Sequence, residues 1–173
     1  MKIIVDSMGS DKGPKEIVQG VVDGVNELGV DAIIVGRENI ISKELSKYNY
    51  PKDSIEIINA EEKQLVGRKR KGVLSEEELE ELLDLTKTSI KEYIDSSMVL
   101  ALEALASGQG DGLVSTGSTG ALLAGGLFIV KRIEGVERPA LATVYPTKKG
   151  ISFILDVGAN VDSKPEYLLQ FAT

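Results

Sequence analysis

The first 60 residues alternate between short β-branched runs and longer segments of helical periodicity, and this alternation limits the folds open to the chain. Apolar runs at 2–6, 30–36 and 54–60 are typical of buried strands. A helix is predicted from Pro14 to a C-cap at Gly29, because apolar residues there recur every three or four positions. A second helix is expected at 37–48. This strand–helix order predicts a parallel sheet with right-handed crossovers.

The remainder of the chain extends the α/β pattern. The expected elements are a helix at 95–108, a strand at 111–117, a helix at 118–133, strands at 140–145 and 151–156, and a helix from Pro165. The last two strands flank a "TKKG" turn and are candidates for a hairpin. We expect residues 1–173 to form a single α/β domain.

The middle segment, 63–94, has a different character. A basic loop at 66–72 precedes a predicted amphipathic helix at 74–94, which opens with a capping box of Ser75 and Glu78. The "RKRK" run in that loop is interpreted either as a docking site for an acidic partner or as a solvated connection.

Composition excludes several classes of chemistry. The chain has no Cys and no His, so thiol nucleophiles, disulfides, common zinc sites and Ser-His-Asp triads are absent. A formal net charge of -7 and 5% aromatic residues argue against a nucleic-acid partner. No cofactor or metal is expected. The N-terminus has no signal-peptide pattern and no apolar run approaches a membrane span, so a cytoplasmic location is expected.

Residues 113–128, "LVSTGSTGALLAGGLF", contain the first candidate site. A strand ends near Ser115 and a helix begins near Thr119, with hydroxyls and glycines between them. Ligands bind at the carboxyl ends of parallel strands, where free N–H groups and small residues favour an anion. The alternative is a helix of small residues packed beneath a neighbour.

Two more loops follow strands. In "DVGANVDSKPE", at 156–166, Lys164 lies near Asn160 and Asp162, a combination that can bind phosphate or stabilise an oxyanion. The alternative is a polar loop that caps the next helix. In "DSMGSDKGPKE", at 6–16, Asp6, Asp11 and Lys12 flank the same sheet edge if the strands are adjacent, or else belong to an N-cap loop with solvated charges.

Several long motifs occur together and in order. They are "KIIVDSMGSDKGPKEIVQG", "DSSMVLALEAL", "DGLVSTGSTGALLAGGLFIV", "RIEGVERPALATVYPT" and "LDVGANVDSKPEYLLQFA". Together they resemble the bacterial phosphate acyltransferase (PlsX) family of phospholipid synthesis. The resemblance implies transfer of a fatty acyl group from acyl carrier protein to inorganic phosphate, which forms an acyl phosphate. It also implies a three-layer sandwich with a mainly parallel sheet, of the isocitrate/isopropylmalate dehydrogenase-like fold, and a homodimer.

The family motifs assign expected roles to individual residues. Lys164 would neutralise charge on the phosphate or the reacting carbonyl, Asn160 would orient the phosphate, and Asp156 belongs to the same catalytic motif. Expected phosphate or substrate contacts are Ser115, Thr116, Gly117, Ser118, Thr119, Gly120, Gly158, Asp6, Gly9, Asp11 and Arg138.

The chain departs from the family pattern in two places. The family is about twice this length, so we expect a truncated form whose other half carries part of the cleft, much of the dimer interface and an amphipathic region for peripheral membrane association. The 63–94 segment is interpreted as inserted, substituted or engineered. Two alternative functions stay open: a non-catalytic α/β domain that retains an anion site, and a phosphotransacetylase-like acyl transfer to phosphate.

Overall fold

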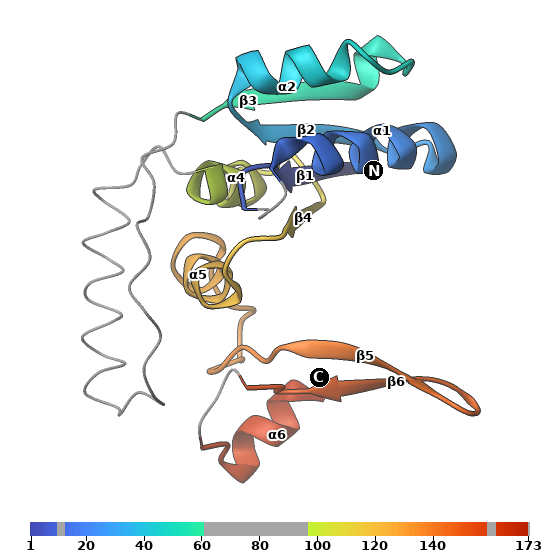
Figure 1. Ribbon diagram of the computed structural model, residues 1–173. Coiled ribbons are helices and arrows are strands. Elements are labelled where there is room, and N and C mark those ends of the chain that lie inside the picture. The colour runs from blue at the N-terminus through green and yellow to red at the C-terminus, as the bar shows by residue number, and fades with distance from the viewer. Residues whose placement is uncertain (10–12, 61–96, 159–161, 173) are drawn as a thin grey trace. The chain divides into compact units, whose positions relative to one another are not determined.

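The computed structural model describes residues 1–9, 13–60, 97–158 and 162–172. The chain divides into two compact units, Met1–Val130 (unit 1) and Lys131–Thr173 (unit 2). Figure 1 draws unit 1 in colours from blue to light orange and unit 2 in colours from orange to red. The predicted basic loop at 66–72 and the amphipathic helix at 74–94, with Ser75 and Glu78, lie outside the described residues.

A four-stranded sheet forms the centre of unit 1. Its strands are β1 (Lys2–Asp6), β2 (Asp31–Gly36), β3 (Ile55–Asn59) and β4 (Gly112–Ser115). Their order is β3-β2-β1-β4, and each neighbouring pair is parallel. The predicted parallel α/β sheet is therefore confirmed, and β1 lies in its interior between β2 and β4.

Helices α1 (Pro14–Leu28) and α2 (Glu38–Leu45) lie against one face of this sheet, and α4 (Ser97–Ala106) lies against the other. Unit 1 also contains α5 (Thr119–Gly125), a 3-10 turn η1 (Lys52–Ser54) and a π-helical turn η2 (Gly126–Val130). Within the described residues, none of these helices combines the length and the hydrophobicity that a membrane crossing requires.

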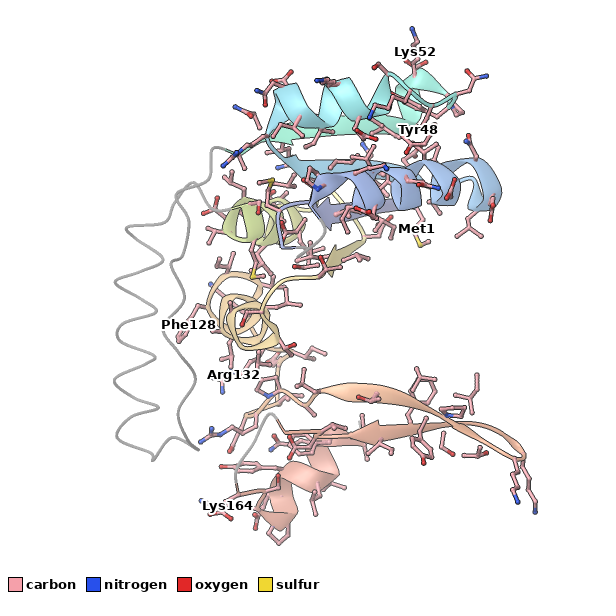
Figure 2. The ribbon with its side chains drawn as sticks, viewed as in Figure 1. Met1, Tyr48, Lys52, Phe128, Arg132 and Lys164 are labelled. Carbon is pink, nitrogen blue, oxygen red and sulfur yellow. The ribbon has the colours of Figure 1, made fainter. Side chains whose placement is uncertain are left out.

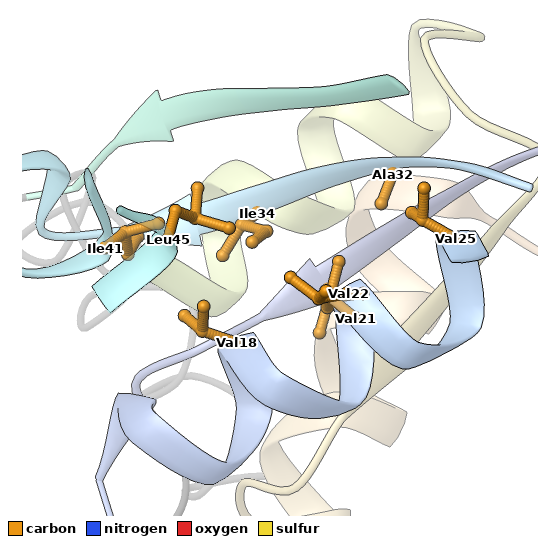
Figure 3. Close-up of a cluster of buried hydrophobic side chains, with 9 residues drawn as sticks. Val18, Val21, Val22, Val25, Ala32, Ile34, Ile41 and Leu45 are labelled. Atoms are coloured by element: carbon orange, nitrogen blue, oxygen red, sulfur yellow. The ribbon is translucent and has the colours of Figure 1, made fainter. Parts of the chain in front are cut away.

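One face of the sheet packs against α1 and α2. The valines of α1 recur at helical spacing and meet alternate residues of β1 and β2, because successive strand side chains point to opposite faces. The buried cluster, most of which is labelled in Figure 3, comprises Val5, Val18, Val21, Val22, Val25, Ala32, Ile34, Ile41 and Leu45. Gly29 ends α1 with a left-handed φ of 65°, as its predicted C-cap role requires.

The opposite face packs against α4. Ile4, Ile33 and Val35 are the strand residues that point this way, and the small side chains of Ala101 and Ala104 let the helix approach them closely. The two central strands, β1 and β2, are thus buried on both sides, which explains why they appear in the sequence as continuous apolar runs.

The helix predicted at 118–133 differs in the structure. The α-helix α5 ends at Gly125 and a π-helical turn, η2, carries the chain to Val130. Two consecutive glycines, Gly125 and Gly126, hold the α-conformation weakly, and Gly125 packs against the side chain of Leu102. This local weakness accounts for the change in helix type.

Unit 2 contains an antiparallel hairpin and a helix. Strands β5 (Ala142–Thr147) and β6 (Gly150–Leu155) pair directly, and α6 spans Pro165–Phe171. The hairpin is confirmed, but its first strand begins and ends two residues later than predicted. Thr147 pairs with Gly150, so only Lys148 and Lys149 form the loop, and a φ of 136° at Gly150 accommodates the tight reversal.

The core of unit 1 generates a stability prediction. Replacing Ile34, which is fully buried, with Ala should lower the free energy of unfolding by about 2–5 kcal/mol, because the change removes buried methyl groups and leaves a cavity. Leu28→Ala, at a residue that is 75% exposed, should change it by less than about 0.5 kcal/mol. Urea denaturation measures both, and equal losses would contradict this description of the core.

Candidate functional site

The carboxyl ends of β1 and β4 lie side by side. Asp6, the last residue of β1, is in register with Ser115, the last residue of β4. The sequence predicts that Asp6 lies at the same sheet edge as the other candidate loops if the strands are adjacent. The sheet order shows that β1 and β4 are adjacent. The loops that follow both strands therefore leave the sheet at the same edge, where parallel α/β sheets bind ligands.

The carboxylate of Asp6 is the hub of a buried hydrogen-bond network. Its Oδ1 accepts from the Ser97 hydroxyl at 2.6 Å and from the Met8 N–H at 3.1 Å. Its Oδ2 accepts from the Ser115 hydroxyl at 2.8 Å. Ser115 Oγ accepts in turn from the Gly117 N–H at 3.1 Å. Burying a charge is tolerated only when it is paired or hydrogen-bonded, and this network meets that demand.

Two glycines bring the loops after β1 and β4 into direct backbone contact. A Cβ atom placed on Gly9 would lie 2.6 Å from both Cα and N of Gly117 and 3.2 Å from Asp6 Oδ2. A Cβ atom on Gly117 would lie 2.6 Å from the Met98 Cε. Real Cβ atoms do not approach backbone so closely, so glycine is required at Gly9 for the two loops to meet.

The loop after β1 is also attached to β2. The Ser7 hydroxyl donates to the Val35 carbonyl at 2.9 Å, and the Ser7 N–H donates to the same oxygen at 3.0 Å. Gly36 leaves space for that hydroxyl, since a Cβ atom there would lie 2.1 Å from Ser7 Oγ. The start of this loop therefore has a defined path along the sheet edge.

The turn from β4 to α5 presents small polar residues. Thr116, Ser118, Thr119 and Gly120 are exposed, whereas Gly117 is half-buried. Ser118 is the N-cap residue of α5, and its Oγ accepts a long contact of 3.5 Å from the Ala121 N–H. The surface of this turn therefore carries hydroxyl groups and, at Gly120, an exposed backbone with no side chain over it.

The second group of expected site residues lies in unit 2. Asp156 has a positive φ of 62°, and its Oδ2 accepts from the Ser163 hydroxyl at 2.6 Å. Its carbonyl accepts from the Gly158 N–H at 3.0 Å, with Gly158 at a φ of 86°. These contacts turn the chain sharply after β6. Such a conformation is uncommon for a residue other than glycine and, when observed, is a pointer to function.

Two cationic side chains share one aromatic ring in unit 2. The guanidinium carbon of Arg138 lies 5.8 Å and the Nζ of Lys164 lies 6.0 Å from the centre of the Tyr167 ring. Lys164 is the N-cap residue of α6 (Figure 2). The Glu137 N–H donates to Gln170 Oε1 at 2.8 Å, which fastens the residue before Arg138 to the same helix.

The structure brings the expected residues together in two groups. Unit 1 gathers Asp6, Gly9, Ser115, Thr116, Gly117, Ser118, Thr119 and Gly120, and unit 2 gathers Arg138, Asp156, Gly158 and Lys164. The expected residues Asp11 and Asn160 lie outside the described residues. No group of three acidic residues that could hold a metal occurs in the part of the chain that the structure describes.

Sequence reasoning missed Ser97 and Tyr167. Ser97 is 91 positions from Asp6 and belongs to the "DSSM" motif. Nothing in that motif distinguishes it from any other serine near the start of a helix. Tyr167 is three residues after Lys164, and residues at this spacing are neighbours on a helix. That spacing was the signal in the sequence that could have identified Tyr167.

The contact between Gly9 and Gly117 generates a second prediction. Gly9→Ala should destabilise the protein by about 1–3 kcal/mol, because the new methyl group overlaps the Gly117 backbone. The matched control is Gly20→Ala, on the exposed side of α1 with open space around it, which should stabilise by about 0.5–1 kcal/mol. Thermal unfolding measures both, and a neutral Gly9→Ala would mean that the two loops do not touch.

Comparison with solved structures identifies fold relatives. A phosphotransacetylase from Streptococcus pyogenes superposes with a TM-score of 0.66 at 19% identity and covers 99% of this chain and 51% of its own. The EutD phosphotransacetylase from Staphylococcus aureus superposes with a TM-score of 0.60 at 20% identity, over 98% of this chain and 50% of its own. At these identities the likeness concerns the α/β fold.

Comparison with sequences identifies closer relatives. A phosphate acyltransferase from Clostridium botulinum is 46% identical over 173 residues, and one from Alkaliphilus oremlandii is 42% identical over 171. Each match includes 99% of this chain but 47% and 46% of the relative, so the chain spans about half the length of these proteins. The family model described as "Fatty acid synthesis protein" matches residues 1–173. The chain belongs to this family, as its resemblance to the PlsX phosphate acyltransferases predicted.

Proposed function

We propose that this chain takes part in the transfer of an acyl group from acyl carrier protein to inorganic phosphate. The observation that carries the proposal is the match of the whole chain to one family, together with relatives of 42–46% identity named phosphate acyltransferase. The product is an acyl phosphate that feeds phospholipid synthesis.

The reaction requires few kinds of protein group. A phosphate oxygen attacks the thioester carbonyl, so a carbon–oxygen bond forms while the carbon–sulfur bond breaks and the thiol of the carrier leaves. Phosphate is itself the nucleophile, and a chain with no His and no Cys can therefore support the step. The protein must position two substrates, offset the charge of phosphate and stabilise the carbonyl oxygen as it becomes negative.

In unit 1, the turn after β4 is assigned to substrate contact. Thr116, Ser118 and Thr119 carry exposed hydroxyls, and Gly120 lets a substrate approach the backbone. Such groups donate hydrogen bonds to phosphate oxygens or to a developing oxyanion. We assign these residues, rather than the half-buried Gly117, to direct contact.

In unit 2, the loop after β6 is assigned to charge compensation. Lys164 and Arg138 are the cations of this group, and their shared contact with Tyr167 keeps both near the start of α6. Lys164 offsets the charge of phosphate or of the carbonyl oxygen, and Asn160 orients the phosphate. Asp156 and Gly158 shape the loop through the hydrogen bonds from Ser163 and within the turn.

The family resemblance also supports wider proposals. We infer an isocitrate/isopropylmalate dehydrogenase-like three-layer sandwich, to which residues 1–173 contribute one domain, and assembly as a homodimer. We further infer a cytoplasmic location with peripheral membrane association. The parallel sheet with helices on both faces supports the first of these.

The assignment of Lys164 generates the third prediction. In the native polypeptide that carries these residues, Lys164→Gln should lower the rate of acyl phosphate formation by about 100-fold, because a charge that offsets the transition state is lost. Lys149→Gln, in the loop of the hairpin, is the matched control and should retain the full rate. The assay follows acyl phosphate formed from acyl carrier protein thioester and inorganic phosphate.

The outcomes of this assay separate the competing functions. Full activity in Lys164→Gln would remove its catalytic role. Preference for a short-chain thioester of a small thiol over the carrier-bound substrate would favour a phosphotransacetylase-like reaction. A wild-type protein that forms no acyl phosphate from either donor would favour a non-catalytic α/β domain.

A further inference from the structure

Three hydrogen-bond donors from separate parts of unit 1 converge on the Asp6 carboxylate. We propose that Asp6 and Ser97 are positioning residues, which fix the shape of the turn at 115–117 without touching substrate. This inference rests on the proposed function, because that turn leads directly into the residues assigned to substrate contact. It gives Asp6 a different task from the phosphate contact that the family motif suggests.

The burial and hydrogen bonding of Asp6 argue against direct contact with phosphate. The residue is 1% exposed, and both carboxylate oxygens already accept hydrogen bonds from protein donors. Gly9 and Gly117 lie close to Oδ2, so backbone separates it from the surface. A phosphate anion brought against this carboxylate would also meet a like charge at short range. Asp6 therefore acts through the residues that it holds.

Ser115 transmits the position of Asp6 to the turn. Its hydroxyl hydrogen points to Asp6 Oδ2, which leaves the lone pairs of Oγ to accept the Gly117 N–H. A hydroxyl rotates freely unless an acceptor fixes it, and the carboxylate is that acceptor. The path of the chain at Gly117 consequently depends on where Asp6 lies.

Ser97 holds the carboxylate from a different element. It lies at the start of α4 and is 8% exposed, and its hydroxyl donates to Oδ1 at 2.6 Å. Ser115 and Ser97 therefore bind different oxygens of one carboxyl group, and together they fix its rotation as well as its position. Removal of the Ser97 hydroxyl leaves Met8 as the remaining partner of Oδ1 among these three donors.

The first test observes the network without any substrate. Amide hydrogen exchange at Gly117, followed by NMR in the 173-residue chain, should become about fivefold faster in Ser97→Ala and in Ser115→Ala. That factor corresponds to the loss of one ordinary hydrogen bond. Ser107→Ala is the matched control. Ser107 directly follows α4, and its hydroxyl donates to the Ala104 carbonyl at 3.0 Å, away from Asp6. Its loss should leave the exchange rate at Gly117 unchanged.

Asp6→Asn is the second variant, and it keeps the experiment decisive if Ser97→Ala does not fold. The amide has nearly the volume of the carboxyl group, but its nitrogen cannot accept a hydrogen bond, so one serine hydroxyl loses its acceptor. Gly117 exchange should again accelerate about fivefold. Unchanged exchange at Gly117 in a folded Asp6→Asn or Ser97→Ala protein would overturn the inference.

The second test measures catalysis in the native polypeptide. Ser97→Ala should lower kcat for acyl phosphate formation about tenfold, because displaced substrate contacts lose transition-state stabilisation. Ser97→Thr, which keeps a hydroxyl on the same carbon, should restore most of the rate. A role limited to packing would not depend on the hydroxyl in this way. Full kcat in Ser97→Ala, with a changed KM for phosphate in Asp6→Asn alone, would show direct phosphate contact by Asp6 and overturn the inference.

The two tests keep this inference separate from the proposed function. If the wild-type protein forms no acyl phosphate while Gly117 exchange responds to Ser97→Ala, the proposed reaction fails and the positioning network stands. If the wild-type protein is active while neither exchange nor kcat responds to the variants, the proposed reaction stands and the positioning role fails.

Discussion

The hydrogen bonds to the buried carboxylate of Asp6 hold together the edge of the unit 1 sheet where β1 and β4 end. A charge in this position is stable only if its oxygens are satisfied, and the donors come from α4, from the end of β4 and from the loop after β1. The pairing of β1 with β4 and the packing of α4 must both be correct before the donors can meet. The fold and the candidate site are therefore stabilised by the same contacts, and a change in one changes the other.

The repeating pattern of the first 60 residues was sufficient to predict the parallel sheet. Strands buried on both faces form continuous apolar runs, and the valines of α1 follow the helical period, so local sequence and tertiary structure agree here. The position of Asp6 and Ser115 at one edge follows from the same logic, since the carboxyl ends of parallel strands coincide. The order of strands does not follow from local pattern, because it depends on which helix covers which face.

The parts that sequence reasoning missed depend on contacts between distant segments. The hydroxyl of Ser97 meets Asp6 across 91 residues, and Gly9 meets Gly117 through backbone atoms that leave no mark on hydrophobic periodicity. The change to a π-helical turn at 126–130 follows a pair of glycines, of which Gly125 packs against the side chain of Leu102. Residue type indicates that such positions are unusual, but only the tertiary structure shows which partner each one has.

The two groups of site residues differ in chemistry. The turn after β4 is uncharged, and in a chain of net charge -7 it offers little long-range attraction to a phosphate anion. Arg138 and Lys164 are exposed cations that share the Tyr167 ring, so unit 2 carries a local positive charge that the turn after β4 lacks.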